Sequence, residues 1–260
     1  MLMQRQIGRR WRLACFVMAS MLSLGACADV SDGAGDEEEL EALAAEEHPD
    51  LGKGNGRDVV MIGDSWMYNT LQIEGTGGGI TPALQRAGAR FRGYAIQGVW
   101  LLQDSLFGPA VPVQWDRAVR QNPDIKTVIM TGGGNDVIQT PGLQADCRRN
   151  GPNCAALLKR IGETLGALWK KMGDAGVKDV LYVGYSESAG NAGPNAPTPL
   201  KNGIAEICAA QTNIRCHVLD TTPLVPERGL AIDGIHPLAR INNKIAAAIL
   251  QKLEDEGMRR

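Results

Sequence analysis

The chain has 260 residues, of which 44% are hydrophobic and 22% are charged, and its formal net charge is −2 at pH 7. This length and composition fit a globular protein with one good-sized core or two small ones. The small net charge argues against a protein that binds nucleic acid through an overall basic field, so we expect no nucleic-acid partner.

The charge is spread unevenly along the chain. Residues 1–27 carry four basic residues and no acid, whereas residues 28–57 carry ten acids against two bases. The remainder holds 19 acids and 21 bases and is close to neutral. The acidity therefore belongs to a segment that precedes the folded part.

The N-terminal residues have the pattern of an export signal. Four arginines precede the apolar run "LACFVMASMLSLGA" (13–26), which is short for a membrane span. The run leads into "LGAC", which resembles the bacterial lipobox and implies cleavage before Cys27 and acylation of it. We expect residues 1–26 to be a lipoprotein-type signal peptide, and the exported protein to be anchored to a membrane of the bacterial cell envelope. The alternative is a secretory signal cut near Ala28, which would give a soluble secreted or periplasmic protein.

Residues 27–57 are small, acidic and interrupted by glycine, which is typical of a solvated, flexible linker. A linker of this kind would tether a folded domain to a lipid anchor. We expect that domain to occupy residues 58–260.

From residue 58 onward, strand-like and helix-like segments alternate. The strand-like runs are short, rich in β-branched residues and bounded by Gly, Asn or Asp; they span 58–62, 91–96, 126–131, 179–184 and 214–220. The helix-like stretches span 81–88, 111–122, 155–176 and 237–257. This alternation predicts a three-layer α/β/α sandwich around a flavodoxin-like parallel sheet of about five strands. In such folds, ligands bind beyond the carboxyl ends of the strands.

Four cysteines lie in the expected domain, and their number fits an exported protein. Three pairings are possible, but the local pairs Cys147–Cys154 and Cys208–Cys216 close short loops, and we expect these two disulfides. The sequence has no C-x-x-C motif or nearby histidine cluster, so we expect no metal site.

A serine nucleophile needs a base, and the chain has three histidines. His48 lies in the acidic segment, and His217 lies within a predicted strand. His236 lies in "DGIHP" (233–237), three residues after Asp233, so the carboxylate can reach the imidazole. The alternative for this segment is a helix entry with polar capping residues.

The nucleophile candidate is Ser65, in "GDSW" (63–66) after the first predicted strand. We expect Ser65 to begin a helix, whose N-terminus would favour negative charge, and Asp64 to brace the turn. The alternative is that Asp64 or Ser65 is only a helix N-cap. A rival nucleophile is Ser186 in "GYSES" (184–188), which lacks the second glycine of the GxSxG pattern.

An oxyanion needs two or three donors that converge on one point. Gly98 follows the second predicted strand and offers a backbone N–H, and Asn135 follows the third strand and offers a side-chain amide. The Ser65 N–H would be the third donor. The alternative for "GGGND" (132–136) is a tight turn that needs positive φ.

These blocks together resemble the SGNH, or GDSL-type, hydrolase family. They are Ser65 in "GDSW", Gly98 in "QGVW", Asn135 in "GGND", and Asp233 with His236 in "DGIHP". The resemblance implies hydrolysis of carboxylic esters through an acyl-Ser65 intermediate, without a metal or other cofactor. His236 would be the base and then the acid, with Asp233 as its orienter. The Ser65 N–H, the Gly98 N–H and the Asn135 amide would form the oxyanion hole.

Two positions qualify this resemblance. Trp66 stands where the family name has leucine, and Gly93 is the alternative position for the second block. Residues 186–203 are rich in Gly, Pro and Asn and are expected to form a loop. The following four residues are expected either to line an acyl or sugar pocket or to belong to the core: Trp66, Trp100, Leu101 and Leu102.

The expected substrate is a small-molecule or glycan-linked ester, and we expect the protein to be a monomer. The competing interpretation is a non-catalytic, tethered glycan-binding or structural lipoprotein with the same fold. The joint presence of the candidate catalytic residues argues against it, because a binding module needs no triad.

Overall fold

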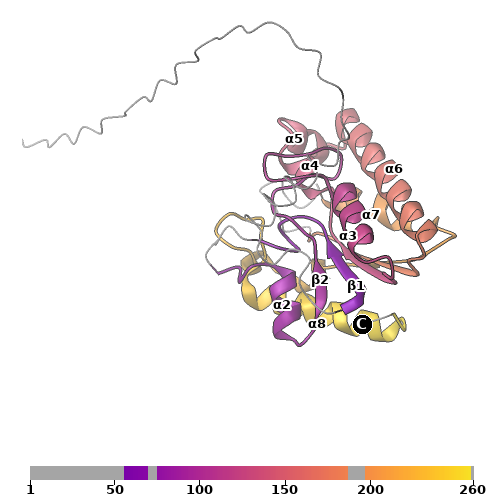
Figure 1. Cartoon of the computed structure of the whole chain (residues 1–260). Helices are drawn as coiled ribbons and strands as arrows, with labels where there is room; N and C mark the ends of the chain where they lie inside the picture. The colour runs from indigo at the N-terminus through magenta and orange to yellow at the C-terminus, as the bar shows by residue number, and fades with distance from the viewer. Residues whose placement is uncertain (1–55, 70–74, 187–196, 259–260) are drawn as a thin grey trace, which may run out of the picture.

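The computed structural model describes residues 56–69, 75–186 and 197–258 (Figure 1). The expected signal peptide, Cys27, His48 and nearly all of the expected linker lie outside these residues. Within the described ranges, no helix is both long enough and apolar enough to cross a membrane.

The centre of the fold is a five-stranded sheet with the order β2-β1-β3-β4-β5. All neighbouring strands pair in parallel. This order is the flavodoxin-like one and confirms the predicted architecture. The strands are β1 (Gly56–Ile62), β2 (Phe91–Gly93), β3 (Thr127–Met130), β4 (Asp179–Val183) and β5 (Arg215–Leu219).

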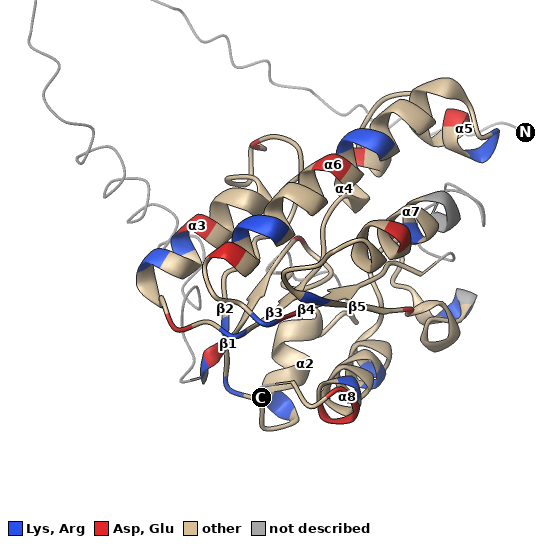
Figure 2. Cartoon of the chain, turned by 90° about the vertical axis from the view of Figure 1, so that its right-hand side faces the viewer, with Lys and Arg blue, Asp and Glu red and all other residues tan. Residues whose placement is uncertain are grey.

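Helices cover both faces of the sheet (Figure 2). One face carries α3 (Val111–Gln121), α6 (Pro152–Asp174) and α7 (Pro197–Ala209), and the other carries α2 (Ile80–Arg86) and α8 (Ala239–Asp255). The shorter elements are α4 (Gly134–Ile138), α5 (Leu143–Arg148), η1 (Thr222–Leu224) and η2 (Glu227–Gly229).

The sequence pattern explains these layers. Every residue of β3 and β4 is buried, as expected for parallel strands that are covered on both faces and therefore read as continuous apolar runs. On α8, apolar residues recur every four positions and form the buried face of the helix: Ile241, Ile245, Ile249 and Leu253.

The structure differs from the predicted elements in several details. β2 ends at Gly93 rather than at residue 96, and α8 begins at Ala239, two residues after Pro237. The expected loop at 186–203 is wrong in its last part, because α7 begins at Pro197; residues 187–196 lie outside the described residues. The short helices α4 and α5 were not predicted, because five or six residues carry too little periodicity to stand out.

Both predicted disulfides are present. The bond between Cys147 and Cys154 joins α5 to the first turn of α6, with a Cα–Cα distance of 4.9 Å. The bond between Cys208 and Cys216 joins the end of α7 to β5, with a Cα–Cα distance of 5.2 Å. Each disulfide therefore fixes one helix to the next element along the chain.

Candidate active site

The sequence blocks meet at the carboxyl edge of the sheet. β1 ends at Ile62, three residues before Ser65, and β3 ends at Met130, five residues before Asn135. Gly98 follows the end of β2 by five residues. Because parallel strands place their carboxyl ends at one edge, the sheet carries all three blocks to the same side of the molecule.

Ser65 lies in a turn. The backbone N–H groups of Met67 and Tyr68 both donate to the carbonyl oxygen of Asp64 at 3.0 Å, but the turn does not continue as a helix. The next helix of the described residues, α2, begins at Ile80. The prediction that Ser65 begins a helix is therefore wrong, and the amide of Ser65 does not lie at a helix N-terminus.

The turn depends on Gly63. Its φ is +137°, and a Cβ at this position would lie 2.2 Å from Oγ1 of Thr131, so only glycine fits. The buried side-chain amide of Gln114 also holds Gly63. Its Oε1 accepts a hydrogen bond from the Gly63 N–H at 2.7 Å, and its Nε2 donates to the Gly63 carbonyl oxygen at 3.0 Å. These bonds fix the backbone two residues before Ser65.

Asp64 braces the same turn. Its Oδ1 accepts hydrogen bonds from the Trp66 backbone N–H and the Thr131 hydroxyl, each at 3.1 Å, and its Oδ2 accepts one from the Tyr185 hydroxyl. Burial raises the pKa of Asp64 above its ordinary value, and these three hydrogen bonds oppose that shift. Burial also raises the pKa of Tyr185 well above its ordinary value, so the phenol stays protonated and acts as the hydrogen-bond donor to Asp64. This placement agrees with the expected bracing role of Asp64.

Ser65, His236 and Asp233 form a continuous series of hydrogen bonds. Nε2 of His236 lies 2.7 Å from Oγ of Ser65, and Nδ1 of His236 lies 2.5 Å from Oδ2 of Asp233. Ser65 is 9% exposed, so its hydroxyl lies in a largely enclosed position. In this geometry the imidazole can take the hydroxyl proton while the carboxylate orients the ring.

A compact loop holds the histidine and its carboxylate together. Oδ1 of Asp233 accepts the backbone N–H groups of Ile235 at 2.9 Å and of His236 at 3.1 Å. Burial alone would raise the pKa of Asp233, but the hydrogen bonds from His236 and Ile235 outweigh it and lower the pKa below its ordinary value. The carboxylate is therefore ionised throughout the neutral pH range.

Gly98 and Asn135 lie in adjacent segments at this edge. Gly98 has a φ of +69°, and a Cβ there would lie 2.4 Å from the ring of Phe107. Asn135 lies in the first turn of α4, and its side-chain amide donates to the carbonyl oxygen of Val99 at 2.8 Å. This bond ties the segment that follows β2 to the start of α4.

Asp136 holds the segment that follows Gly98. Its Oδ2 accepts the backbone N–H of Leu101 at 2.8 Å, and its Oδ1 accepts that of Leu102 at 3.0 Å. The side chain is fully buried, and burial raises the pKa of Asp136 while these two hydrogen bonds oppose the shift. The sequence indicated Asn135 in this block, but it did not indicate that Asp136 holds the backbone of Leu101 and Leu102.

Three residues that hold the site, Gln114, Thr131 and Tyr185, carry no mark in the sequence pattern considered above. Thr131 directly follows β3 and Tyr185 follows β4 by two residues, so the rule that the carboxyl ends of parallel strands meet could have found both. Gln114 lies inside α3, where nothing in the pattern shows that a buried amide contacts the turn after β1.

Ser186 and Gly93 are the rival candidates for the nucleophile and for the second block. Ser186 is fully buried, and its hydroxyl oxygen lies 3.4 Å from the carbonyl oxygen of Val225. Gly93 lies within β2, where it pairs with Met61 of β1, so Gly98 is the glycine beyond the strand end. Of the four pocket candidates, Trp66 and Leu101 are buried in the core, and Trp100 and Leu102 are partly exposed.

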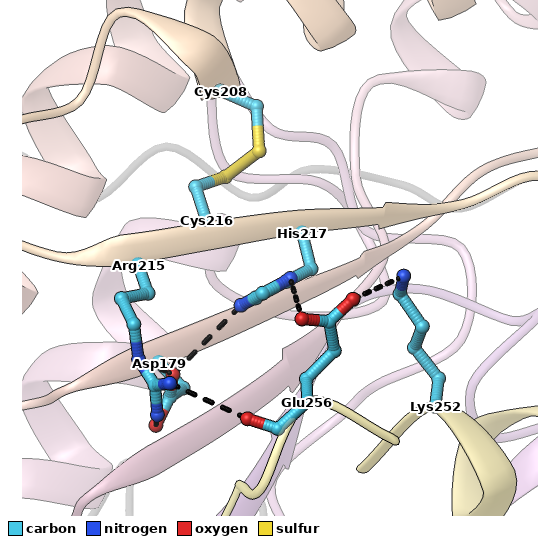
Figure 3. A network of polar contacts seen from close by, with 7 residues as sticks. All are labelled: Asp179, Cys208, Arg215, Cys216, His217, Lys252 and Glu256. Carbon is cyan, nitrogen blue, oxygen red and sulfur yellow. Dashed lines mark hydrogen bonds and ion pairs between the residues drawn. A yellow bond between two sulfur atoms is a disulfide. The ribbon is translucent and has the colours of Figure 1, made fainter.

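His217 belongs to a network of charged groups at the start of β4 and β5 (Figure 3). Its Nδ1 lies 3.6 Å from Oε2 of Glu256, and its Nε2 lies 3.9 Å from Oδ1 of Asp179. Asp179 also pairs with Arg215 at 2.7 Å, and Glu256 pairs with Lys252 at 2.6 Å. Since Asp179 and Arg215 are the first residues of their strands, this network lies toward the amino edge of the sheet, away from Ser65.

Metal-ligating residues do not cluster in the part of the chain that the structure describes. In those ranges, no group of three or more His, Cys, Asp or Glu side chains is placed to hold a metal ion.

No family model matches the sequence, and no curated protein matches it. Solved structures do match the fold. Est24, a carbohydrate acetylesterase from Sinorhizobium meliloti, matches with a TM-score of 0.58 at 15% identity, over 76% of this chain and 99% of that chain. An aryl esterase from M. Smegmatis matches with a TM-score of 0.57 at 15% identity, over 76% of this chain and 99% of its own.

A third match is Axe2, an acetylxylan esterase from Geobacillus stearothermophilus. Its TM-score is 0.52 at 19% identity, over 78% of this chain and 96% of that chain. At such identities the likeness shows the fold alone: this chain shares with these esterases an α/β fold, which here has a five-stranded parallel sheet between helices.

Proposed function

We propose that the protein is a serine ester hydrolase that cleaves carboxylic esters through an acyl-Ser65 intermediate. The observation that carries this proposal is the hydrogen-bonded series from Ser65 Oγ through His236 to Asp233, with distances of 2.7 and 2.5 Å. A nucleophile, a base and an orienting carboxylate in this order are the arrangement that acyl transfer to serine needs. The fold shared with esterases supports the same class.

Acylation begins when Oγ of Ser65 attacks the ester carbonyl carbon and His236 Nε2 takes the hydroxyl proton. The Asp233 carboxylate, whose pKa is lowered by its hydrogen bonds to His236 and Ile235, stabilises the imidazolium that forms. The tetrahedral intermediate then collapses, His236 gives the proton to the leaving alcohol, and the acyl group stays on Ser65.

Deacylation repeats the steps with water. His236 takes a proton from a water molecule as its oxygen attacks the acyl carbonyl carbon, and then returns the proton to Oγ of Ser65. The products are a carboxylic acid and an alcohol, and one water molecule is consumed.

The negative oxygen of each intermediate is bound by the N–H groups of Ser65 and Gly98 and by the amide of Asn135. An amide nitrogen carries two hydrogens, and one of them is donated to Val99, so the second is available to the substrate. The bond to Val99 sets the direction of the amide before the substrate arrives. Such preorganisation is what makes an oxyanion hole effective.

The proposed substrates are small or glycan-linked esters. The matching structures include a carbohydrate acetylesterase, an aryl esterase and an acetylxylan esterase, and their names support ester substrates of modest size for this chain. The alternative, a non-catalytic glycan-binding module, does not explain why a histidine lies within hydrogen-bond distance of the Ser65 hydroxyl.

We also infer that the protein is exported and anchored through acylated Cys27. The inference rests on "LGAC" (24–27) and on the acidic segment that follows it. The two disulfides are consistent with an oxidising compartment.

The test of the activity is hydrolysis of p-nitrophenyl acetate and p-nitrophenyl octanoate by the wild type and three variants. Ser65→Ala and His236→Ala should each lower kcat by several orders of magnitude, because the members of a triad act as a unit. Ser186→Ala should retain activity. Loss of activity in Ser186→Ala together with an active Ser65→Ala would refute the assignment of the nucleophile.

A further inference from the structure

Four large hydrophobic side chains are exposed in the described part of the chain. Leu106 and Ile232 are fully exposed, Phe107 is 44% exposed and Val113 is 42% exposed. Three of the four lie on the segments that carry the proposed catalytic groups, whereas Val113 lies on α3. Because single exposed apolar side chains are common, the presence of three of the four on these two segments is the feature that needs an explanation.

Leu106 and Phe107 lie at the tip of a hydrogen-bonded turn. Ser105 N–H donates to the Gly108 carbonyl oxygen at 3.0 Å, and Gly108 N–H donates back to the Ser105 carbonyl oxygen at 3.3 Å. Oγ of Ser105 also accepts the Phe107 backbone N–H at 3.1 Å. These bonds fix the backbone of the turn, so Leu106 and Phe107 leave the chain at defined positions at its tip.

The ring of Phe107 rests against Gly98. The position of a Cβ at Gly98 lies 2.4 Å from Cδ2 and 2.7 Å from Cγ of this ring. The backbone N–H of Gly98 is a donor of the proposed oxyanion hole, so the aromatic ring borders the place where the ester carbonyl would bind.

Ile232 directly precedes Asp233 in a second hydrogen-bonded loop. Gly234 N–H donates to the Ala231 carbonyl oxygen at 2.9 Å, and Ala231 N–H donates to the His236 carbonyl oxygen at 2.7 Å. These bonds hold an apolar side chain in solvent within four residues of the proposed base.

We propose that these three side chains, Leu106, Phe107 and Ile232, form an apolar rim that binds the apolar part of the ester substrate. The occupant is the substrate because the ring of Phe107 lies against Gly98 and Ile232 directly precedes Asp233. Contact with an acyl chain or an aryl alcohol removes this apolar surface from water, which is favourable. This inference rests on the proposed function and names the substrate class of the same site: esters with an apolar group, in preference to acetylated sugars.

The test uses the full chain and its variants Leu106→Asn, Ile232→Asn and the double variant, with Val113→Asn as the matched control. Phe107 is left in place because its ring contacts Gly98. One arm compares kcat/KM for p-nitrophenyl hexanoate with that for p-nitrophenyl acetate. The other arm compares 2-naphthyl acetate with ethyl acetate. The first ratio reports the acyl chain and the second reports the alcohol.

The double variant should lower at least one of the two ratios by about 5- to 20-fold, since each fully buried methylene contributes about fourfold. Val113→Asn should keep both ratios within about twofold of the wild type, as surface substitutions usually do. Unchanged ratios in the double variant of an active enzyme would overturn the rim alone. If the ratios are unchanged, and the wild type sediments as a dimer but the double variant as a monomer, a second copy of the chain covers these side chains instead of the substrate. A wild type that hydrolyses none of the four esters would overturn the proposed function and the rim together.

Discussion

The indole N–H of Trp66 donates a hydrogen bond to the backbone carbonyl oxygen of Ile235 at 3.1 Å. Trp66 follows the proposed nucleophile and Ile235 precedes the proposed base, so this bond joins the two loops whose relative position sets the distance from Ser65 to His236. The buried indole also packs edge-on against the ring of Tyr185, with centroids 5.2 Å apart. Tyr185 in turn donates to Asp64, so a chain of contacts runs from the base loop to the nucleophile turn.

Trp66→Phe should therefore lower kcat more than it changes KM. The variant keeps an aromatic ring but loses the N–H, and a lost hydrogen bond of about 1 kcal/mol corresponds to a fall in kcat of about fivefold. Steady-state kinetics with p-nitrophenyl acetate measure both constants.

The matched control for this variant is Trp169→Phe. Trp169 makes a similar edge-on contact with Tyr182, with centroids 6.2 Å apart, and its indole N–H lies against Sδ of Met130. Both variants should lower the melting temperature, but only Trp66→Phe should lower kcat. Equal kinetic effects in the two variants would show that Trp66 acts through general stability.

Asn135→Ala should lower kcat by about a hundred- to a thousandfold with a small change in KM. The reason is that the amide binds the charged oxygen of the intermediate more strongly than the ground-state carbonyl. Asn213→Ala is a suitable control, because the Asn213 amide also donates to a backbone carbonyl oxygen, that of Lys170, at 3.1 Å. A normal kcat in Asn135→Ala would leave this residue as a structural tie to Val99 only.

His217→Gln should flatten the dependence of stability on pH. Burial lowers the pKa of His217 below its ordinary value, although Glu256 and Asp179 act in the opposite direction. The unfolded chain therefore binds a proton at this residue more readily than the folded protein does. The free energy of unfolding should decrease as pH falls below about 6.5 and through the lower pKa of the folded state.

Thermal unfolding of the wild type and His217→Gln between pH 7.5 and 5 measures this contribution. The positively charged groups near His217, Arg215 and Lys252, are present in both proteins, so the difference between the two pH slopes isolates the histidine. A steeper slope in the variant would mean that folding raises the pKa of His217, which is the opposite of the expected direction.

The N-terminal proposal has its own test in a bacterial host. The full chain should be found in the membrane fraction, and Cys27→Ser should move it to soluble or uncleaved material. Cys15→Ser is the control, since this cysteine lies in the apolar run of the same expected signal peptide. Soluble wild-type protein with an N-terminus other than Cys27 would favour simple secretion.

The order of the fold was predictable because parallel strands such as β3 and β4 are mostly apolar runs bounded by Gly, Asn or Asp. The same regularity indicated Ser65 and Asn135, as polar residues beyond strand ends. His236 was indicated instead as the histidine of the expected domain that follows a carboxylate, Asp233, within one turn. The turn at Ser65 was not predictable as such, because a glycine followed by Asp and Ser fits a helix entry equally well.

The contacts that hold the site were harder to foresee. Gln114 reaches Gly63 across 51 residues, and Tyr185 reaches Asp64 across 121 residues. Such bonds depend on how α3 and β4 pack against the end of β1, and a local sequence pattern carries no information about that packing. The short loops closed by the two disulfides are the opposite case, since their pairing follows from proximity along the chain.

The most direct test of the central claim is covalent labelling of the folded protein with a fluorophosphonate, followed by mass spectrometry. An activated serine should take up one label for each molecule, and peptide mapping should find it on Ser65. Ser65→Ala and His236→Ala should remain unlabelled, whereas Ser186→Ala should be labelled like the wild type. A folded wild-type protein that takes up no label, or one labelled at Ser186 instead, would contradict the assignment of Ser65 as the nucleophile.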